Sequence, residues 1–150
     1  TITLLAIARA DKSEKHDLFE DANRLKDLAL KAEPNMEDLA ELDRAMNIKL
    51  AKMAHNPVFE WIMDAIQLGF SSNDFVLYQD SYYRRKTVEN WQETAALIKS
   101  NDPLKALASI SKHYNLLRRC LKQEPLEDRI VRDDFWDESN SNSEQSVNED

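Results

Sequence analysis

The chain has 150 residues, of which 42% are hydrophobic and 32% charged, and its formal net charge is −8 at pH 7. A single glycine argues against β-rich folds with many tight turns, and a single cysteine excludes a disulfide framework and a cysteine-built zinc site. No apolar run approaches the roughly 18 residues that a membrane span needs. These limits predict an all-helical, cytoplasmic chain whose charge argues against a nucleic-acid-binding surface of its own.

The first ten residues are apolar at helical spacing, and no capping residue precedes them. We therefore expect a helix that is entered part-way, with a segment of the parent protein preceding Thr1. Asp11-Lys12-Ser13 ends this helix, and Ser13 is the expected N-cap of the next one. Apolar residues then recur every three or four positions, at Leu18, Ala22, Leu25 and Ala29.

Asparagine and proline mark the next boundaries. Asn35 is a suitable N-cap for a third helix, with an apolar face formed by Leu39, Leu42, Met46, Leu50 and Met53. Asn56-Pro57 places a capping asparagine before a proline, which predicts the start of a fourth helix. Its expected core residues are Phe59, Ile62, Met63, Ile66 and Phe70. Gly69 and the polar run 71–74 either end this helix or only loosen it, and the pattern does not decide between the two.

A fifth helix is expected to begin around Arg84-Arg85-Lys86-Thr87, with an apolar stripe at Val88, Trp91, Ala95 and Ile98. Asp102-Pro103 starts the last long helix, which Gln123-Glu124-Pro125 ends, and a short turn over 126–136 is expected to pack onto the bundle. The predicted fold is an antiparallel bundle of about six helices, the first truncated, in one domain over residues 1–132.

Residues 133–150 include seven acidic side chains and no basic one, so the rest of the chain sums to only −1. This polar segment contains too little apolar surface to offset the entropy lost on ordering. We predict an acidic, disordered tail, and a partner-binding acidic tail is the alternative.

Signatures of enzymes are absent: the sequence contains no GxSxG, Walker loop, HExxH or CxxC motif. Cys120 lies beside Arg118 and Arg119, which could lower the pKa of a thiol. Without an orienting histidine nearby in sequence, it is interpreted as a packing residue. We therefore predict that the chain is not an enzyme.

A few polar residues adjoin the apolar stripes. Asp43 and Asn47 are four residues apart, so both side chains leave one face of the third helix. They either point oxygens into the bundle, as metal-binding bundles do, or are exposed and paired with basic neighbours. His113, flanked by Ile110 and Leu117, is either a satisfied core histidine or a ligand-binding one.

Two segments carry a resemblance to a known family. The first runs Asp43-Arg44-Ala45-Met46-Asn47 and then Leu50-Ala51-Lys52-Met53-Ala54-His55-Asn56-Pro57. The second combines Ala95-Ala96-Leu97-Ile98, Asn101-Asp102, Ala106 and His113. In this order and at this separation, they resemble the ligand-binding domain of the FadR branch of GntR transcriptional regulators. The resemblance covers residues 1 to about 122.

The resemblance implies a helical bundle that dimerises and senses a small effector, often a carboxylate metabolite. Many such bundles hold zinc or nickel with one aspartate and three histidines. Asp43 matches the aspartate and His113 the third histidine, whereas Asn47 and Trp91 stand where the other two histidines would be. Metal binding would rest on Asp43 and His113 only, so we expect most of the affinity to be lost, because indole cannot coordinate a metal.

The leading hypothesis is the effector-sensing and dimerisation domain of a bacterial GntR/FadR-type regulator, with a carboxylate-like or acyl metabolite in a pocket at Asp43, Asn47, Trp91 and His113. Operator DNA would be bound only through an upstream winged-helix domain, and no membrane is involved. The alternative hypothesis is a helical dimerisation module that has lost ligand sensing.

Overall fold

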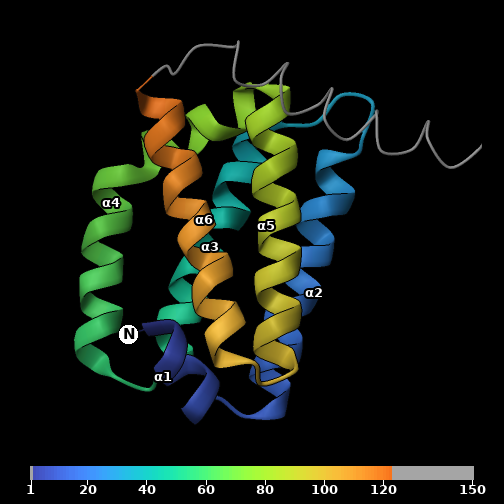
Figure 1. Ribbon diagram of the computed structural model, residues 1–150. Coiled ribbons are helices and arrows are strands. Elements are labelled where there is room, and N and C mark those ends of the chain that lie inside the picture. Colours follow the sequence, from blue (N-terminus) through green and yellow to red (C-terminus); the bar gives the residue numbers. More distant parts are fainter. Residues whose placement is uncertain (1, 123–150) are drawn as a thin grey trace, which may run out of the picture.

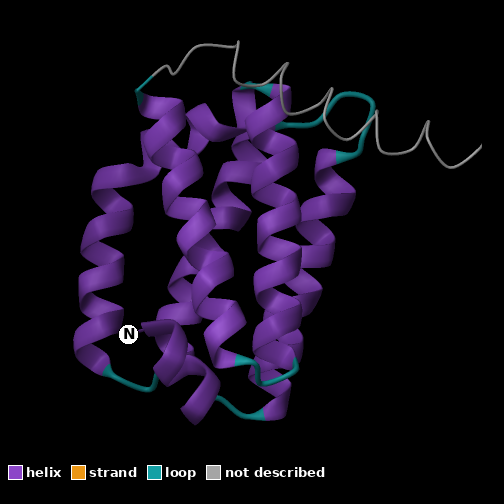
Figure 2. Ribbon diagram, in the orientation of Figure 1, coloured by secondary structure: helices purple, strands orange, loops and turns teal. Residues whose placement is uncertain are grey.

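The computed structural model describes residues 2–122, with the side chains of 68–74 excepted. Over this range the chain forms only helices and the loops between them, which confirms the predicted all-α class (Figures 1 and 2). The helices are α1 (Ile2–Arg9), α2 (Lys12–Ala29), α3 (Met36–Met53), α4 (Pro57–Gln79), α5 (Ser81–Lys99) and α6 (Pro103–Leu121). The predicted acidic tail 133–150, the predicted turn over 126–136 and the domain limit at residue 132 lie outside the described residues.

The long helices lie side by side, with α5 packed between α2 and α6, and α3 packed against α1, α2 and α4 (Figure 1). Their apolar stripes meet in one core. Its fully buried members come from all six helices, and the largest of those on α2, α3 and α5 include Leu18, Leu25, Leu39, Met46, Trp91 and Ile98. Burial of such side chains contributes about 1.5–3 kcal/mol each, which makes this core the main source of the bundle's stability.

Side-chain caps fix most helix starts as predicted. Asn35 accepts hydrogen bonds from the backbone N–H groups of the first turn of α3, and Asn56 does the same for α4 ahead of a proline. The prediction that Ser13 caps α2 is wrong. Asp11 is the N-cap, because its carboxylate accepts from the Glu14 N–H at 2.8 Å while the Glu14 carboxylate accepts from the Asp11 N–H at 2.9 Å. This reciprocal capping box satisfies two backbone donors at once.

The helix starting near Arg84 begins earlier than expected. Asp80 accepts hydrogen bonds from the Tyr82 and Tyr83 N–H groups, so α5 starts at Ser81. The question left open at Gly69 is also resolved, since α4 continues through it to Gln79.

The predicted inward face of α4 is partly wrong. Met63 is buried, but Ile62 and Ile66 are 37% and 42% exposed, and Trp61 is 73% exposed. The apolar residues of α4 extend beyond the face that packs against α3. The spacing of apolar residues therefore indicates two apolar faces on α4, of which only one is covered by the other helices. Phe70 lies among the side chains that are not described.

Candidate functional site

The two polar residues of α3 point into the bundle. Asp43 is completely buried and Asn47 is 6% exposed. The alternative in which both are exposed is therefore wrong. Asn47 donates from Nδ2 to the Asp43 carboxylate and to the Asp43 carbonyl oxygen, both at 3.1 Å. The i, i+4 spacing produces this contact, since residues four apart lie one above the other on a helix.

Asp43 is the centre of a hydrogen-bonded group that joins three helices. Tyr78 on α4 donates its hydroxyl to Oδ2 at 2.9 Å, and Trp91 on α5 donates its indole N–H to Oδ1 at 2.6 Å. With Asn47, three donors therefore converge on one buried carboxylate. Carboxylate oxygens accept hydrogen bonds, and all three groups that contact the Asp43 oxygens are donors. We call Asp43, Asn47, Tyr78, Trp91 and His113 the Asp43 cluster.

His113 joins this cluster from α6 through a ring contact. It is 3% exposed, and its imidazole lies 5.8 Å from Trp91 between ring centroids, tilted by 56°. The structure thus brings together all four residues that the sequence singled out, from α3, α5 and α6. Hydrogen bonds link three of them, and van der Waals contact between rings links the fourth.

A polar layer between α5 and α6 sets this ring contact. Asn90 donates to the Ser109 carbonyl oxygen at 2.8 Å, and Thr94 donates to the Ser109 hydroxyl at 2.9 Å. Asn90 precedes Trp91 in the chain, and Ser109 lies one turn before His113. Fixing Asn90 against Ser109 therefore also fixes the height of the indole relative to the imidazole.

Glu93 extends this layer to the surface. Its carboxylate accepts hydrogen bonds from Ser109 Oγ at 3.0 Å and from Lys112 Nζ at 2.8 Å. The hydrogen bond from Lys112 lowers the pKa of Glu93 below its ordinary value, burial opposes this shift, and the hydrogen bond from Ser109 adds to it. The layer thus ends in a charged contact that holds α5 to α6.

Two buried polar atoms near the Asp43 cluster have no hydrogen-bond partner among the described residues. They are Nδ1 of His113 and the hydroxyl oxygen of Thr87, which is fully buried. Thr87 lies one turn before Trp91 on α5, about 6 Å along the helix axis. A buried polar atom without a partner costs about 1–3 kcal/mol. A ligand that supplied partners here would recover part of that cost.

Sequence reasoning missed Tyr78. It belongs to the run Phe75-Val76-Leu77-Tyr78, where a tyrosine is not distinguishable from a core aromatic. Its hydroxyl becomes informative only once α4 is placed beside Asp43. The one available signal is general: a buried tyrosine needs a partner for its hydroxyl, and a buried aspartate needs donors.

The residues present do not fit the zinc or nickel ion implied by the resemblance. The Trp91 N–H and the Tyr78 O–H already engage both oxygens of Asp43. Of the two remaining positions, Asn47 directs an amide N–H toward the carboxylate, and indole carries no lone pair for a metal. Within residues 2–122 no group of three or more His, Cys, Asp or Glu side chains is placed to hold a metal ion.

Other features of the described part of the chain limit its function. Cys120 is half-buried on α6, in agreement with a packing role. Within residues 2–122, no helix combines the length and the apolar character that crossing a membrane requires.

Comparison with known proteins identifies the family. The family model of the FCD domain matches residues 1–116. The search of curated proteins found no significant match, and neither did the search of solved structures. FCD domains are regulatory domains of transcription factors and not a known enzyme family. The match covers most of the chain, so the chain belongs to the FCD domain family, the C-terminal effector-binding domain of GntR-family regulators such as FadR.

Proposed function

We propose that this chain senses a small carboxylate-like or acyl metabolite in the bundle core, beside the Asp43 cluster, on behalf of a bacterial GntR/FadR-type regulator. The observation that carries the proposal is the buried Nδ1 of His113, which has no hydrogen-bond partner within residues 2–122 and belongs to a ring that lies beside the indole of Trp91. A histidine at this place would bind a ligand oxygen by donating from Nδ1, and more strongly when it is protonated and the ligand is anionic.

The surroundings of His113 suit a ligand with a polar head and an apolar body. The Thr87 hydroxyl is a second buried polar group that lacks a partner in the described part of the chain. The neighbouring surface is aromatic and aliphatic, since Trp91, Met46 and Ile110 are all buried in the same core. Sites for small molecules commonly combine an apolar lining with a few such polar groups.

The Asp43 cluster offers a route from ligand to protein shape. Asp43 joins α3, α4 and α5 through hydrogen bonds, and His113 belongs to α6. A ligand that moves His113 against Trp91 would change the packing of α6 on a hydrogen-bonded group shared by three other helices. A ligand regulates a protein only if it binds one packing of the helices more tightly than another, and this change in packing would provide the second arrangement.

In this proposal the regulator acts as a homodimer in the cytoplasm, and α4 supplies the dimer face. Val58 and Trp61 on this helix are 57% and 73% exposed, and Ile62 and Ile66 are also exposed. Adjacent exposed apolar side chains of this size mark an interaction surface, whereas single ones are ordinary. Operator DNA is contacted by a separate winged-helix domain and not by this chain, because the net charge of −8 is unfavourable for binding the phosphate backbone.

Thermal melts with acetate, lactate, octanoate and octanoyl-coenzyme A test ligand sensing. We expect at least one of these probes to raise the melting temperature in a saturable way, because a ligand that binds only the folded state stabilises it. The rise should be lost in His113→Ala and kept in His16→Ala, which changes an exposed histidine on α2. An equal rise in both variants would contradict binding at His113.

One observation favours the second candidate function, a dimerisation module that no longer senses a ligand. Both oxygens of Asp43 already have partners within the chain, and the Trp91 indole takes up space beside them. Under this alternative no probe changes the melting temperature while dimerisation persists.

A further inference from the structure

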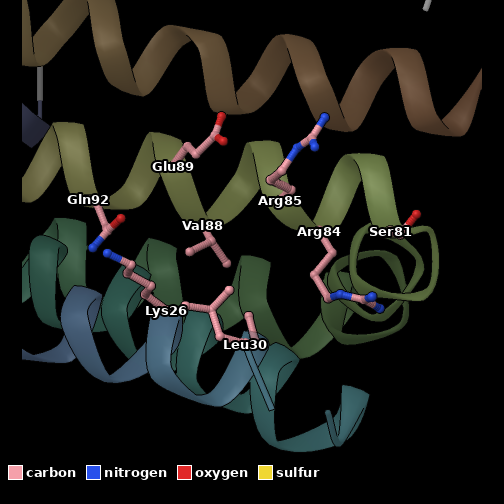
Figure 3. Close-up of a pocket in the computed structure, with 9 residues that line it drawn as sticks. Lys26, Leu30, Ser81, Arg84, Arg85, Val88, Glu89 and Gln92 are labelled. Carbon is pink, nitrogen blue, oxygen red and sulfur yellow. The ribbon is translucent and has the colours of Figure 1, made fainter. Parts of the chain in front are cut away.

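A surface pocket lies between the C-terminal part of α2 and the N-terminal half of α5. Its volume is about 310 Å³, at the small end of the range for ligand sites. Residues of α2 and α5 form its walls, including Lys26, Leu30, Arg84, Arg85, Val88 and Gln92 (Figure 3). We call it the α2–α5 pocket.

The α2–α5 pocket carries an excess of positive charge. Three cationic side chains line it, Lys26, Arg84 and Arg85, and none of them forms an ion pair among the described residues. The one acidic side chain in its lining, Glu89, is paired with Lys86 at 3.1 Å. Cations gathered without counter-charges attract an anion, which would relieve their mutual repulsion.

The positive charges lie toward opposite ends of the pocket. At one end the Lys26 ammonium lies beside the side-chain amide of Gln92, and Arg84 extends toward the other end, where Ser81 begins α5 (Figure 3). Eight residues separate Arg84 from Gln92, which corresponds to about 12 Å along a helix. Leu30 and Val88 face each other between the two ends (Figure 3).

Arg84 is held in place for such a role. One nitrogen of its guanidinium donates to the Tyr78 carbonyl oxygen at 3.0 Å. An arginine has five N–H donors in a rigid plane, so several remain for a second acceptor. The helix N-terminus contributes less here, because Asp80 already accepts from the Tyr82 and Tyr83 N–H groups. An anion in the pocket would therefore be bound mainly by side-chain cations.

Leu30 supplies the apolar part. It is 72% exposed, whereas Val88 opposite it is 6% exposed. A short hydrocarbon chain laid between them would cover the exposed leucine and gain hydrophobic free energy in proportion to the area buried. A small inorganic anion could bind at one end of the pocket but would not contact the apolar part between Leu30 and Val88.

We propose that the α2–α5 pocket is a second ligand site, separate from the core, for an unbranched organic dianion with an acidic group at each end of a short apolar chain. Lys26 binds one acidic group and Arg84 binds the other, Arg85 adds positive charge to the pocket, and Leu30 and Val88 contact the chain. This site does not depend on the proposed core ligand, because none of the residues that line it belongs to the Asp43 cluster.

Isothermal titration calorimetry with suberate and octanoate tests this site. Both compounds have the same chain length, and suberate carries a carboxylate at each end. We expect suberate to bind saturably, and octanoate to bind at least about tenfold more weakly because it leaves one cationic end without a partner. Raising the salt concentration should weaken suberate binding, since the cations are solvent-accessible.

Charge reversal at one end locates the site. Lys26→Glu should weaken suberate binding by at least about tenfold and remove its advantage over octanoate. Arg85→Glu should weaken suberate binding in the same direction. The matched control is Lys12→Glu, which makes the same charge change on an exposed residue at the other end of α2. That variant should keep the wild-type affinity.

Three results would overturn the proposal: no saturable suberate binding below about 10 mM, equal affinities for suberate and octanoate in the His113→Ala variant, where octanoate cannot use the core site, or equal losses in Lys26→Glu and Lys12→Glu. His113→Ala separates the two sites. It should leave suberate binding in the α2–α5 pocket unchanged, so a failure of the core site does not count against this one.

Discussion

The indole N–H of Trp91 donates a 2.6 Å hydrogen bond to Oδ1 of Asp43. The sequence resemblance implies that metal-binding members of the family carry a histidine where this chain has Trp91. The aspartate is fully buried, and its two carboxyl oxygens accept hydrogen bonds from Asn47, Tyr78 and Trp91. A side chain that fills the volume of an ion and donates to the same oxygen makes the ion unnecessary for holding α3 against α5.

Removing the carboxylate should strongly destabilise the bundle. Asp43→Ala leaves the N–H or O–H groups of Asn47, Tyr78 and Trp91 without an acceptor, and each such buried donor costs about 1–3 kcal/mol. We expect a loss of at least about 3 kcal/mol in the free energy of unfolding in urea. Asp43→Asn should cost less, because it keeps an acceptor for Trp91. Asp17→Ala, on the exposed face of α2, should change stability by less than about 0.5 kcal/mol.

Restoring two histidines should create metal binding. The Asn47→His/Trp91→His variant adds two imidazoles to Asp43 and His113, which gives four ligands of the types that zinc prefers. We expect zinc to raise the melting temperature of this variant and a chelator to reverse the rise, with no such effect on the wild-type chain. Adding His113→Ala should abolish the rise. A wild-type chain stabilised equally by zinc would contradict the interpretation of Trp91.

Disrupting the exposed apolar face of α4 should separate the proposed dimer. Trp61→Glu places a charge where a partner subunit would bury an indole, and burying an unpaired charge is strongly unfavourable. Sedimentation equilibrium should show a dimer for the wild-type chain and a monomer for this variant. Leu104→Glu, at a position on α6 that is 78% exposed, is the control and should remain dimeric. Dimers in both variants would exclude this face.

The α5–α6 contact at Glu93 should make a small, pH-dependent contribution. Its pKa is lowered in the folded state, mainly by the hydrogen bond from Lys112. The contribution is therefore present above the ordinary value of 4.5 and is lost as the pH falls through the lowered folded value. Both side chains are about half exposed, so we expect less than about 1 kcal/mol.

Glu93→Gln should reduce the free energy of unfolding near neutral pH and have no effect in strong acid. Urea unfolding of both chains over this pH range measures the difference. A difference that stays constant with pH would mean that Glu93 acts through packing and not through its charge.

The sequence predicts the helices well and the outer face of α4 poorly, for a physical reason. Caps such as Asn35 and Asn56 act within a single turn, so local residues determine them. Whether Ile66 is buried depends on which helix lies opposite, and an apolar helix with two similar faces does not encode that choice. The N-cap of α2 is also determined locally, although the sequence prediction chose Ser13. Asp11 is the cap because Glu14, three residues later, completes the reciprocal pair of hydrogen bonds.

Four of the five members of the Asp43 cluster could be predicted from the sequence, but Tyr78 and the hydrogen bonds between the members could not. Trp91 lies on an apolar stripe, and Asp43, Asn47 and His113 adjoin one, which makes all four candidates; the burial of Asp43 and Asn47 was left open by the sequence and is given by the structure. The direction of the Trp91 N–H and the arrival of Tyr78 depend on how α4 and α5 pack against α3. No local pattern contains that information. The α2–α5 pocket was missed for the same reason, since Lys26 and Arg84 are distant in sequence.

The most direct measurement of the central claim uses Trp91 as a reporter of the core. In a Trp61→Phe/Trp136→Phe background, the fluorescence of Trp91 comes from an indole that is 1% exposed and in contact with His113. The effector found by thermal melts should change this emission in a saturable way, at the concentrations that raise the melting temperature, and His113→Ala should abolish both effects. Saturable binding that leaves the Trp91 emission unchanged, with the same affinity in His113→Ala, would contradict a ligand site at the Asp43 cluster.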